Sequence, residues 1–429
     1  AARLARAAAA ALQAAPPHAH LLLAHAVLRA LRRALLQEDE DKLAAWAGGA
    51  SEEGEARAPP PLSLQYLHPA YTRLQDLVST ALAHLQPGAE ACELAAGADV
   101  ARLALGWLLL ADGLAAQAAA ARGDLARHYA ELYRQHGYTE PLLEAALRLL
   151  PAELLARALQ QEPPLAALAP AFRRLPPLGV YEYCSGRAVS EAACRALALC
   201  VCGPGAPDVR GWCGARPPRL ARLLDTLVRG YISPAVAKDE ITAVQTKASE
   251  LENTDVTVQW STWEVRCVLT LEERPLELTV RLSPSHPLGL PRIAAPARPA
   301  PGAAHWLRMY MAYQNGSLLG ALRLWTGTVT QTVARAGHCY ICYCRLHVRT
   351  GRLPGVLCRQ CHNKYHVACL VRVAAPRAPA PPPLTGALPV PAHVVLDGPQ
   401  VQLPAVPLAL LAPGGTPRVW CRRLYRTPF

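Results

Sequence analysis

The sequence predicts a multidomain protein with an α-helical solenoid, then a compact α+β domain, then a small finger folded around zinc. Three observations predict this order. Apolar residues recur at three- and four-residue spacing up to about position 231. Alternating β-branched residues replace that spacing at 256. Closely spaced cysteine pairs then gather between 339 and 369, and 429 residues suffice for two or three domains with separate cores.

Residues 1–232 have the apolar spacing of successive amphipathic helices, with Pro-rich or polar breaks near 48–62 and 163–178. Pro69 is expected to mark where the regular part of the second helical run begins. Thr139, before Glu140 and Pro141, predicts a helix start. The predicted runs are 1–45, 63–86, 98–122, 124–136 and 140–160. This succession is typical of an α-solenoid; without a clean repeat period, an irregular helical domain is the alternative.

Residues 190–231 continue the helical pattern and lead toward the next domain. Ser233 is expected to be the N-cap of a further helix, with Pro234 at its first position. That helix is expected to carry the chain into the α+β domain. The apolar stripe of the preceding segment consists of Leu220, Leu223, Leu224, Leu227, Val228 and Tyr231. The apolar face of the further helix consists of Ile241, Val244, Ala248 and Leu251.

Residues 233–332 predict a compact α+β domain. The segments VTVQWSTWEV, RCVLTL and PLELTVRL alternate in polarity and predict strands. After a Pro-rich loop, helices are expected at His305–Gln314 and Ser317–Thr330, and the large packing residues are expected to be Trp260, Trp263, Trp306 and Trp325. Since no nucleophile–base pair or carboxylate pair stands out, we expect no catalytic residue.

Composition restricts the partners only weakly. The net charge of +12 permits a polyanionic partner, but arginines are spread along the chain rather than concentrated on one element. The most apolar stretch, Leu103 to Ala111, lies between Arg102 and Asp112 and is too short to span a bilayer, so we expect no membrane partner. The scattered cysteines fit a reducing compartment. Because the chain begins without Met, we expect it to be part of a longer protein.

The segment from Cys339 to Cys369 contains three pairs of potential zinc ligands. Cys339 and Cys342 form one Cys-x-x-Cys pair, Cys358 and Cys361 a second, and His366 and Cys369 a His-x-x-Cys pair. Thiolate and imidazole are the donors that zinc prefers, and a structural site takes four of them. Six ligands are too many for one zinc and two short of two, so we expect two zincs, with the missing ligands further along. Disulfides and isolated buried thiols are the alternatives.

Other residues near these pairs are weaker candidates. Cys344 and His347 are expected to be loop residues, with a substitute ligand role as the alternative. Residues 374–417 are rich in Pro and Ala and are expected to form a flexible insertion. Cys421 follows that insertion, within a finger that spans 337–429.

With these blocks in view, the chain resembles the C-terminal part of the listerin family of E3 ubiquitin ligases. VRGWCGARPPRLARLLDTLVRGYISP (209–234) is similar to the end of the family's helical region, and residues 1–232 fit its HEAT-like helices. ELTVRLSPSHPLGLPRI and WLRMYMAYQNGSLLGALRLW are similar to its RWD domain. The Cys339–Cys369 segment resembles its RING finger, including the ligand order Cys-Cys-Cys-Cys-His-Cys.

This resemblance implies a ligase that works by positioning rather than through a nucleophile of its own. The RING would bind a ubiquitin-conjugating enzyme, and the RWD domain would dock on the large ribosomal subunit that carries a stalled nascent chain. The expected setting is the ribosome quality control complex in the cytosol. Close placement of thioester and lysine amine is the physical contribution.

The resemblance also implies an interleaved ligand pairing. The first zinc would take Cys339, Cys342, His366 and Cys369, and the second Cys358 and Cys361 with a final pair. Ile341 would contact the conjugating enzyme, with zinc-loop packing as the alternative.

The sequence departs from the family at its end. If Cys421 is the eighth ligand, Arg418 stands where the seventh should be, so the second site is incomplete. Water or one of His347, His362 and His393 is left to fill it. Arg422 would match the residue that bridges to ubiquitin, and Val373 stands where the family usually has Trp.

Two other functions fit the same ligand order. One is a PHD-like reader of histone tails, since Trp420 precedes Cys421 as an aromatic residue does before the last pair of that family. The other is a degenerate RING adaptor that binds ribosomes without ligase activity. The RWD-like domain just upstream favours the ligase over the reader.

Overall fold

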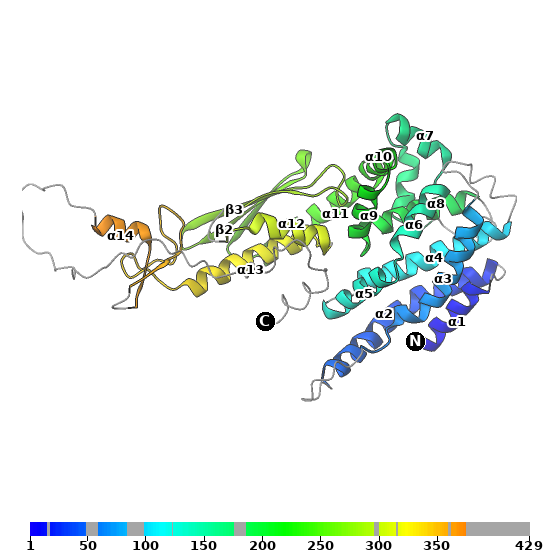
Figure 1. Cartoon of the computed structure of the whole chain (residues 1–429), viewed down its shortest axis with the longest axis horizontal. Helices are drawn as coiled ribbons and strands as arrows, with labels where there is room; N and C mark the ends of the chain where they lie inside the picture. Colours follow the sequence, from blue (N-terminus) through cyan, green and yellow to red (C-terminus); the bar gives the residue numbers. More distant parts are fainter. Residues whose placement is uncertain are drawn as a thin grey trace, which may run out of the picture. The chain divides into compact units, whose positions relative to one another are not determined.

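The computed structural model describes residues 1–14, 18–48, 59–83, 98–121, 123–175, 186–295, 300–314, 316–358 and 362–374. The chain divides into two compact units, Ala1–Val329 and Thr330–Phe429. The first contains helices followed by an antiparallel sheet, and the second contains the cysteine-rich segment (Figure 1). Where the helical and α+β domains meet within the first unit stays a prediction.

Helices make up the chain as far as residue 246. They are α1 (Ala2–Gln13), α2 (His18–Gly48), α3 (Ser63–Leu82), α4 (Ala98–Ala120), α5 (Gly123–Gln135), α6 (Thr139–Leu149), α7 (Ala152–Gln160), α8 (Gly186–Cys202), α9 (Ala206–Ala215), α10 (Pro218–Leu227) and α11 (Ser233–Thr246). A 3-10 segment, η2 (Ala166–Phe172), and a π-helical turn, η3 (Val228–Ile232), complete this series. The helical expectation for this region agrees with the structure.

Three of the expected helix boundaries were wrong. The run 1–45 is two helices, α1 and α2. Pro69 lies inside α3, which begins six residues earlier at Ser63. The run 140–160 is interrupted at Pro151, which has an extended backbone and separates α6 from α7. Apolar spacing runs on across such a break because both helices face the same core.

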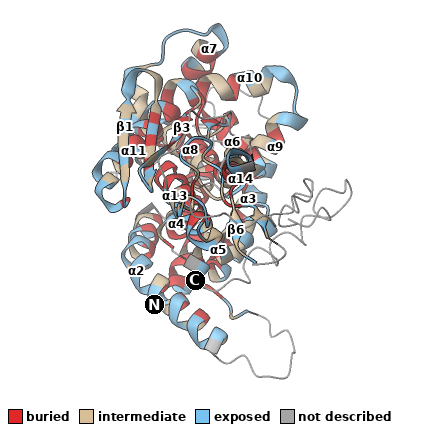
Figure 2. Cartoon of the chain, turned by 90° about the vertical axis from the view of Figure 1, so that its left-hand side faces the viewer, coloured by how far each residue is buried: buried red, intermediate tan, exposed pale blue. Residues whose placement is uncertain are grey.

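Helix α4 is the centre of the helical core. Its residues Leu105, Trp107, Leu109 and Leu110 are fully buried. Figure 2 shows the burial of the chain by colour. Among the described residues, one segment, Val100–Ala120, is long and apolar enough to cross a membrane by length and composition, so the expectation that this stretch is too short was wrong. Most of the segment is buried against neighbouring helices, and this burial accounts for its hydrophobicity.

The chain continues from α10 into α11 without a capped break. Residues Val228–Ile232 form a π-helical turn, and Ser233 lies in a right-handed helical conformation. The hydroxyl of Ser233 donates to the carbonyl of His286 at 2.6 Å. The expectation that Ser233 caps α11 was therefore wrong, because its side chain is used in a tertiary contact. The apolar stripe was correct: Leu224, Leu227 and Val228 are fully buried.

The α+β region contains a four-stranded antiparallel sheet in the order β1-β2-β3-β4. The strands are β1 (Thr254–Gln259), β2 (Glu264–Leu271), β3 (Arg274–Arg281) and β4 (Arg292–Ala294). The segment VTVQWSTWEV is not one strand, because a 3-10 turn at Trp260–Thr262 and a left-handed Trp263 divide it. Trp260 is 43% exposed, so it is not the packing residue that was expected.

Two helices cover one face of this sheet: α12 (Ala303–Tyr313) and α13 (Leu318–Ala336). Their buried residues Leu307, Leu322 and Trp325 form one core with Val265, Leu278 and other inward-facing strand residues. Trp263 and Trp306 are half-buried against that core. Ile241 and Val244 of α11 belong to the same core, so α11 joins the helices to the sheet as predicted.

The second unit has few regular elements. A short hairpin pairs β5 (Val356–Leu357) with β6 (Lys364–Tyr365), and α14 (Val367–Ala374) follows. So small a segment buries few large apolar side chains, which is typical of domains that depend on a bound metal.

Candidate metal centre

Four side chains predicted to share a metal converge in the second unit. They are Cys339, Cys342, His366 and Cys369, whose ligand atoms all lie within 4.8 Å of one another. Cys339, His366 and Cys369 are buried, and Cys342 is half-buried. The two pairs come together across 23 intervening residues, so the fold of the segment brings them to one point.

The first pair lies in a tight turn after α13. The amide of Tyr343 donates to the carbonyl of Cys339 at 2.7 Å, and the amide of Cys339 donates to the carbonyl of Cys344 at 3.0 Å. Tyr343 closes the turn in a left-handed conformation, with φ at 58°. This turn places both thiols of the Cys-x-x-Cys pair on the same side.

The turn that begins at Cys358 has the same hydrogen-bond pattern. The amide of His362 donates to the carbonyl of Cys358, and the amide of Cys358 donates to the carbonyl of Asn363, both at 2.9 Å. His362 is left-handed, with φ at 57°, as Tyr343 is in the first turn. The hydrogen bonds of Cys358 thus match those of Cys339, and its predicted partner Cys361 lies outside the described residues.

His366 and Cys369 are brought together by the start of α14. The amides of Cys369 and Leu370 both donate to the carbonyl of His366 at 3.1 Å. This first helical turn places residues three apart on one side of the helix. His366 directly follows β6, so the antiparallel hairpin β5–β6 places it at the start of α14.

The orientation of the His366 ring fits metal binding. Its Nδ1 lies 3.3 Å from Sγ of Cys342 and 3.8 Å from Sγ of Cys369. Its Nε2 lies 3.2 Å from the carbonyl oxygen of Arg345. A carbonyl accepts only from a protonated nitrogen, so in the neutral imidazole Nδ1 is the unprotonated nitrogen that faces the thiols. Metal-bound histidines typically donate their other ring nitrogen to such a carbonyl.

The spacing of the donors also fits zinc. Zinc lies about 2.3 Å from sulfur and about 2.0 Å from nitrogen, so neighbouring ligands of a tetrahedral site are about 3.5–3.8 Å apart. The two nitrogen–sulfur separations, 3.3 and 3.8 Å, lie on either side of the lower value, which is the one expected for a nitrogen–sulfur pair. Three thiols with one imidazole form the Cys₃His set found in structural zinc sites.

Two thiols of the cluster, Cys339 and Cys369, have opposite pKa shifts. Burial raises the pKa of Cys339, but the amides of His366, Cys342 and Ile341 donate to its sulfur and lower the pKa overall. Burial and the neighbouring thiols Cys342 and Cys339 raise the pKa of Cys369 to about 12. Adjacent thiolates repel one another, and a bound dication would favour the charged form of all three.

The other predicted site residues fall outside this cluster. The thiol of Cys344 donates to the carbonyl of Cys342 at 3.2 Å, and Nδ1 of His347 accepts from the amide of Thr350 at 3.2 Å. Among the described residues, Cys358 has no place in the four-ligand cluster. Cys361, His393, Arg418, Trp420, Cys421 and Arg422 lie outside the described residues, so the second site stays a prediction.

Apolar side chains are exposed around the cluster. Ile341, between the first two ligands, is 36% exposed, and its neighbours Tyr340 and Tyr343 are 57% and 73% exposed. On α14, Val371 and Val373 are 58% and 50% exposed. Such exposed apolar residues on a small domain are typical of a protein-binding surface.

Sequence reasoning missed the residues that hold the cluster in shape. The carbonyl of Arg345 orients His366, and the ammonium group of Lys364 donates to the carbonyl of Ala336 at 3.1 Å, close to the end of α13. Both are contacts to backbone carbonyls, which every residue carries. No sequence signal could have identified them.

Comparison with known proteins adds two findings. Residues 254–332 match a family model described as Ubiquitin conjugating domain-like. The chain is also similar to proteins named E3 ubiquitin-protein ligase listerin. It is 30% identical to that of Drosophila melanogaster over 169 residues, 29% to that of Mus musculus over 170 and 28% to that of Saccharomyces cerevisiae over 171.

These matches cover 38% of this chain but only 10%, 10% and 11% of the three relatives. The chain therefore spans about a tenth of the length of the curated relatives it matches.

The residues matched by the family model, 254–332, contain one cysteine, Cys267. Cys267 lies in β2 with its side chain fully buried in the sheet core. Burial raises the pKa of its thiol to about 12, with Asp255 adding to the effect. A ubiquitin thioester requires an accessible thiolate, so this cysteine is a packing residue.

Proposed function

We propose that this chain, which carries the C-terminal part of a listerin-type E3 ubiquitin-protein ligase, places a ubiquitin-loaded conjugating enzyme beside the lysine that accepts ubiquitin. The chain needs no nucleophile of its own for this. Its contribution is the proximity and orientation of the thioester and the attacking amine. The burial of Cys267 supports this proposal, because the thioester would then be carried by the conjugating enzyme and not by this chain.

The observation that carries the proposal is the cluster of Cys339, Cys342, His366 and Cys369 with exposed Ile341 beside it. We assign zinc to the cluster, as the first site of a RING-type finger. When bound, zinc would hold the first Cys-x-x-Cys turn against α14 and so present Ile341 and its neighbours to the conjugating enzyme. The second site would use Cys358, Cys361 and Cys421, and Arg422 would bridge to ubiquitin.

The α+β and helical domains would position the finger close to its substrate. The α+β unit, as an RWD-like domain, would dock on the large ribosomal subunit, and the HEAT-like helices would connect the finger to the rest of the ligase. The acceptor would be a lysine of a stalled nascent chain, within the ribosome quality control complex of the cytosol. The similarity to listerins supports this assignment.

The test is ubiquitin-chain formation in vitro with the full chain, a conjugating enzyme and labelled ubiquitin. Replacing Cys339 and Cys342 with Ser is expected to abolish chain formation and remove zinc. Ile341→Ala is expected to keep zinc and lower the rate at least tenfold. Val348→Ala is the matched control, because Val348 is 66% exposed in the same unit and should change the rate less than twofold.

Three other results would contradict the proposal. Ribosome binding without chain formation by the unaltered chain would indicate an adaptor. Binding of a histone-tail peptide instead of a conjugating enzyme would indicate a reader. Equal losses from Ile341→Ala and Val348→Ala would show that Ile341 is not a specific contact.

A further inference from the structure

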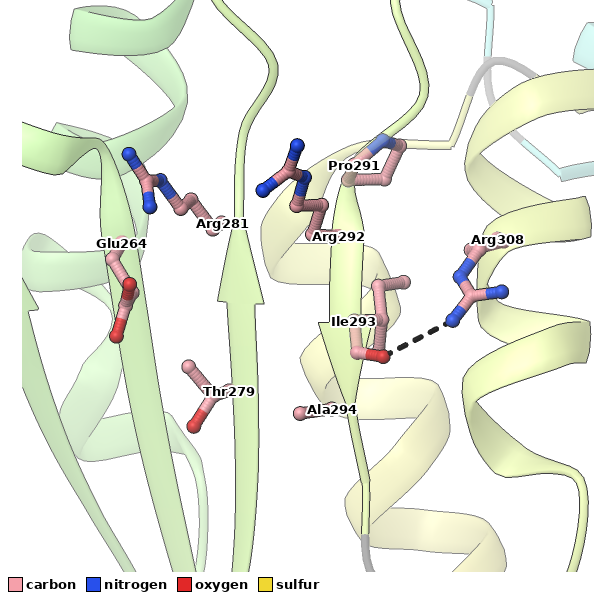
Figure 3. Close-up of a pocket in the computed structure, with 8 residues that line it drawn as sticks. All are labelled: Glu264, Thr279, Arg281, Pro291, Arg292, Ile293, Ala294 and Arg308. Carbon is pink, nitrogen blue, oxygen red and sulfur yellow. Dashed lines mark hydrogen bonds between the residues drawn. The ribbon is translucent and has the colours of Figure 1, made fainter.

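Three arginines surround a shallow hollow of about 450 Å³ at the β4 edge of the sheet. Arg281 comes from β3, Arg292 from β4 and Arg308 from α12 (Figure 3). All three are exposed. Hollows of this volume are common at sites that bind a small ligand or a short peptide segment.

Two of these arginines face each other across the strands. Arg281 is the register partner of Arg292, and on its other side it is the partner of Glu264. Like charges directly opposite in an antiparallel pair are destabilising. Within the described residues, neither Arg281 nor Arg292 makes a side-chain hydrogen bond or ion pair. Their exposed positive charge is therefore available to a bound ligand.

A neighbouring arginine on the same face of the sheet, Arg266, does form an ion pair across the strands. Arg266 lies in β2 two residues from Glu264, and its Nε lies 2.6 Å from Oε1 of Glu277 on β3. The sheet surface thus accommodates an arginine–glutamate pair across its strands. No equivalent pair forms between Glu264 and Arg281 in the described part of the chain.

The third arginine is held at the rim by the edge strand. Nη2 of Arg308 donates to the carbonyl oxygen of Ile293 at 3.3 Å. Buried Pro291 and Ile293 line the hollow between the arginines, together with Ala294. The hollow therefore combines an apolar lining with three guanidinium groups.

We propose that this hollow binds an extended acidic segment of a partner protein. Two carboxylates would accept from Arg281 and Arg292 in the paired geometry that guanidinium groups favour. A small apolar side chain between them would contact Pro291 and Ala294. Binding would also relieve the repulsion between the two arginines, which is the physical reason for a sheet to retain them.

The lining favours a peptide over nucleic acid. Glu264 can accept a backbone N–H from a peptide, a contact that a phosphate backbone cannot make. No aromatic ring lines the described hollow to stack on a base, as sites for single-stranded nucleic acid typically require. The arginines come from three elements and surround one hollow instead of following a phosphate track.

The test is fluorescence anisotropy with the full chain and a fluorescein-labelled peptide that alternates Glu with Val. Arg281→Ala combined with Arg292→Ala is expected to weaken binding at least tenfold. The matched control is Arg219→Ala with Arg222→Ala on α10, which removes the same charge from exposed positions and should change the affinity less than twofold. Raised salt should weaken binding by the unaltered chain.

Thermal unfolding separates loss of the site from loss of the fold. Because the substitutions at 281 and 292 remove a repulsion, the variant should unfold at the same temperature as the unaltered chain or slightly above it. Equal peptide affinity of variant and unaltered chain would overturn the proposal. The proposal would also be overturned if polyuridine RNA bound more tightly than the peptide and the same substitutions abolished that binding. The hollow lies in the first unit, so this result is independent of the ubiquitin assay.

Discussion

At the scale of single residues, one buried carboxylate joins four helices. Asp39 of α2 is fully buried and accepts the amide of Ser63, the first residue of α3, at 3.1 and 2.8 Å. It also accepts the hydroxyl of Tyr129 from α5. The Ser63 hydroxyl lies 2.9 Å from the Tyr129 hydroxyl, and Gln117 of α4 donates to both at 3.4 Å. Asp39, on α2, therefore accepts a backbone amide at the start of α3 that has no partner within its own helix.

Replacing Asp39 with Ala should lower the free energy of unfolding by about 3 kcal/mol, because the Ser63 amide and Tyr129 hydroxyl would be buried without an acceptor. Urea denaturation followed by circular dichroism measures the change. Asp41→Ala is the control, since Asp41 is exposed and among the described residues pairs only with Gln37, and should cost less than about 0.5 kcal/mol. Equal costs at the two positions would mean that the buried network contributes nothing.

At the scale of elements, glycine allows a close approach between α12 and α13. A Cβ added at Gly316 or Gly320 would overlap the Tyr310 side chain. Gly327, further along α13, is exposed and has open space around it. Glycine is thus required at the start of this helix and not in its exposed middle.

These glycines predict opposite effects of the same substitution. Gly316→Ala should destabilise the first unit by about 1 kcal/mol, because the Tyr310 ring must move. Gly327→Ala should stabilise it by about 0.5 kcal/mol through the lower entropy of the unfolded chain. Thermal unfolding of the two variants measures both effects, and a loss at both positions would contradict the argument.

A second contact between elements depends on pH. Asp112 of α4 is buried; its Oδ1 lies 3.1 Å from Nε of Arg195 on α8, and its Oδ2 lies 3.8 Å from Nε2 of His25 on α2. Burial raises the pKa of Asp112, but the adjacent His25 ring and the charge of Arg195 outweigh burial and hold the pKa below its ordinary value. The carboxylate therefore stabilises the fold where it is ionised.

A depressed folded-state pKa gives stability that is present above the unfolded pKa and is lost as pH falls through the folded pKa. Asp112→Asn should therefore cost about 2 kcal/mol at pH 7, and the difference should shrink below about pH 4. Urea denaturation of both proteins from pH 7 to pH 3 measures it. A constant difference across that range would show that the charge of Asp112 is irrelevant.

At the scale of the whole molecule, the two units hold their shape by different means. The first unit has two large apolar cores, whereas the described part of the second buries little beyond Cys339, Cys369, His366, Val333, Leu346 and Leu370. Removing metal should therefore unfold only the second unit.

Chelation with EDTA should speed amide hydrogen exchange in residues 339–374 at least tenfold and leave residues 1–329 unchanged. Mass spectrometry of peptides from the two units measures this. Restoring zinc is the control and should restore protection. Faster exchange throughout the chain would mean that the first unit also depends on the metal.

Much of this organisation was predictable because it depends on local patterns. The helices up to α11 follow from three- and four-residue apolar spacing, and the candidate ligands follow from paired cysteines. Where prediction failed, a distant partner decided the outcome. Ser233 binds the His286 carbonyl instead of capping its helix, and Trp260 lies in an exposed turn instead of a core strand.

The sequence by itself determined the order of the helical, sheet and cysteine-rich regions, the apolar faces and the candidate metal donors, since these depend on residue type and spacing. Only the tertiary structure decided which donors meet, because Cys339 and His366 are joined by turns and a hairpin whose hydrogen bonds use backbone atoms. It also decided that Arg281 faces Arg292, because strand register sets which side chains are opposite. Long-range pairing of backbone is not encoded in any short stretch of residues.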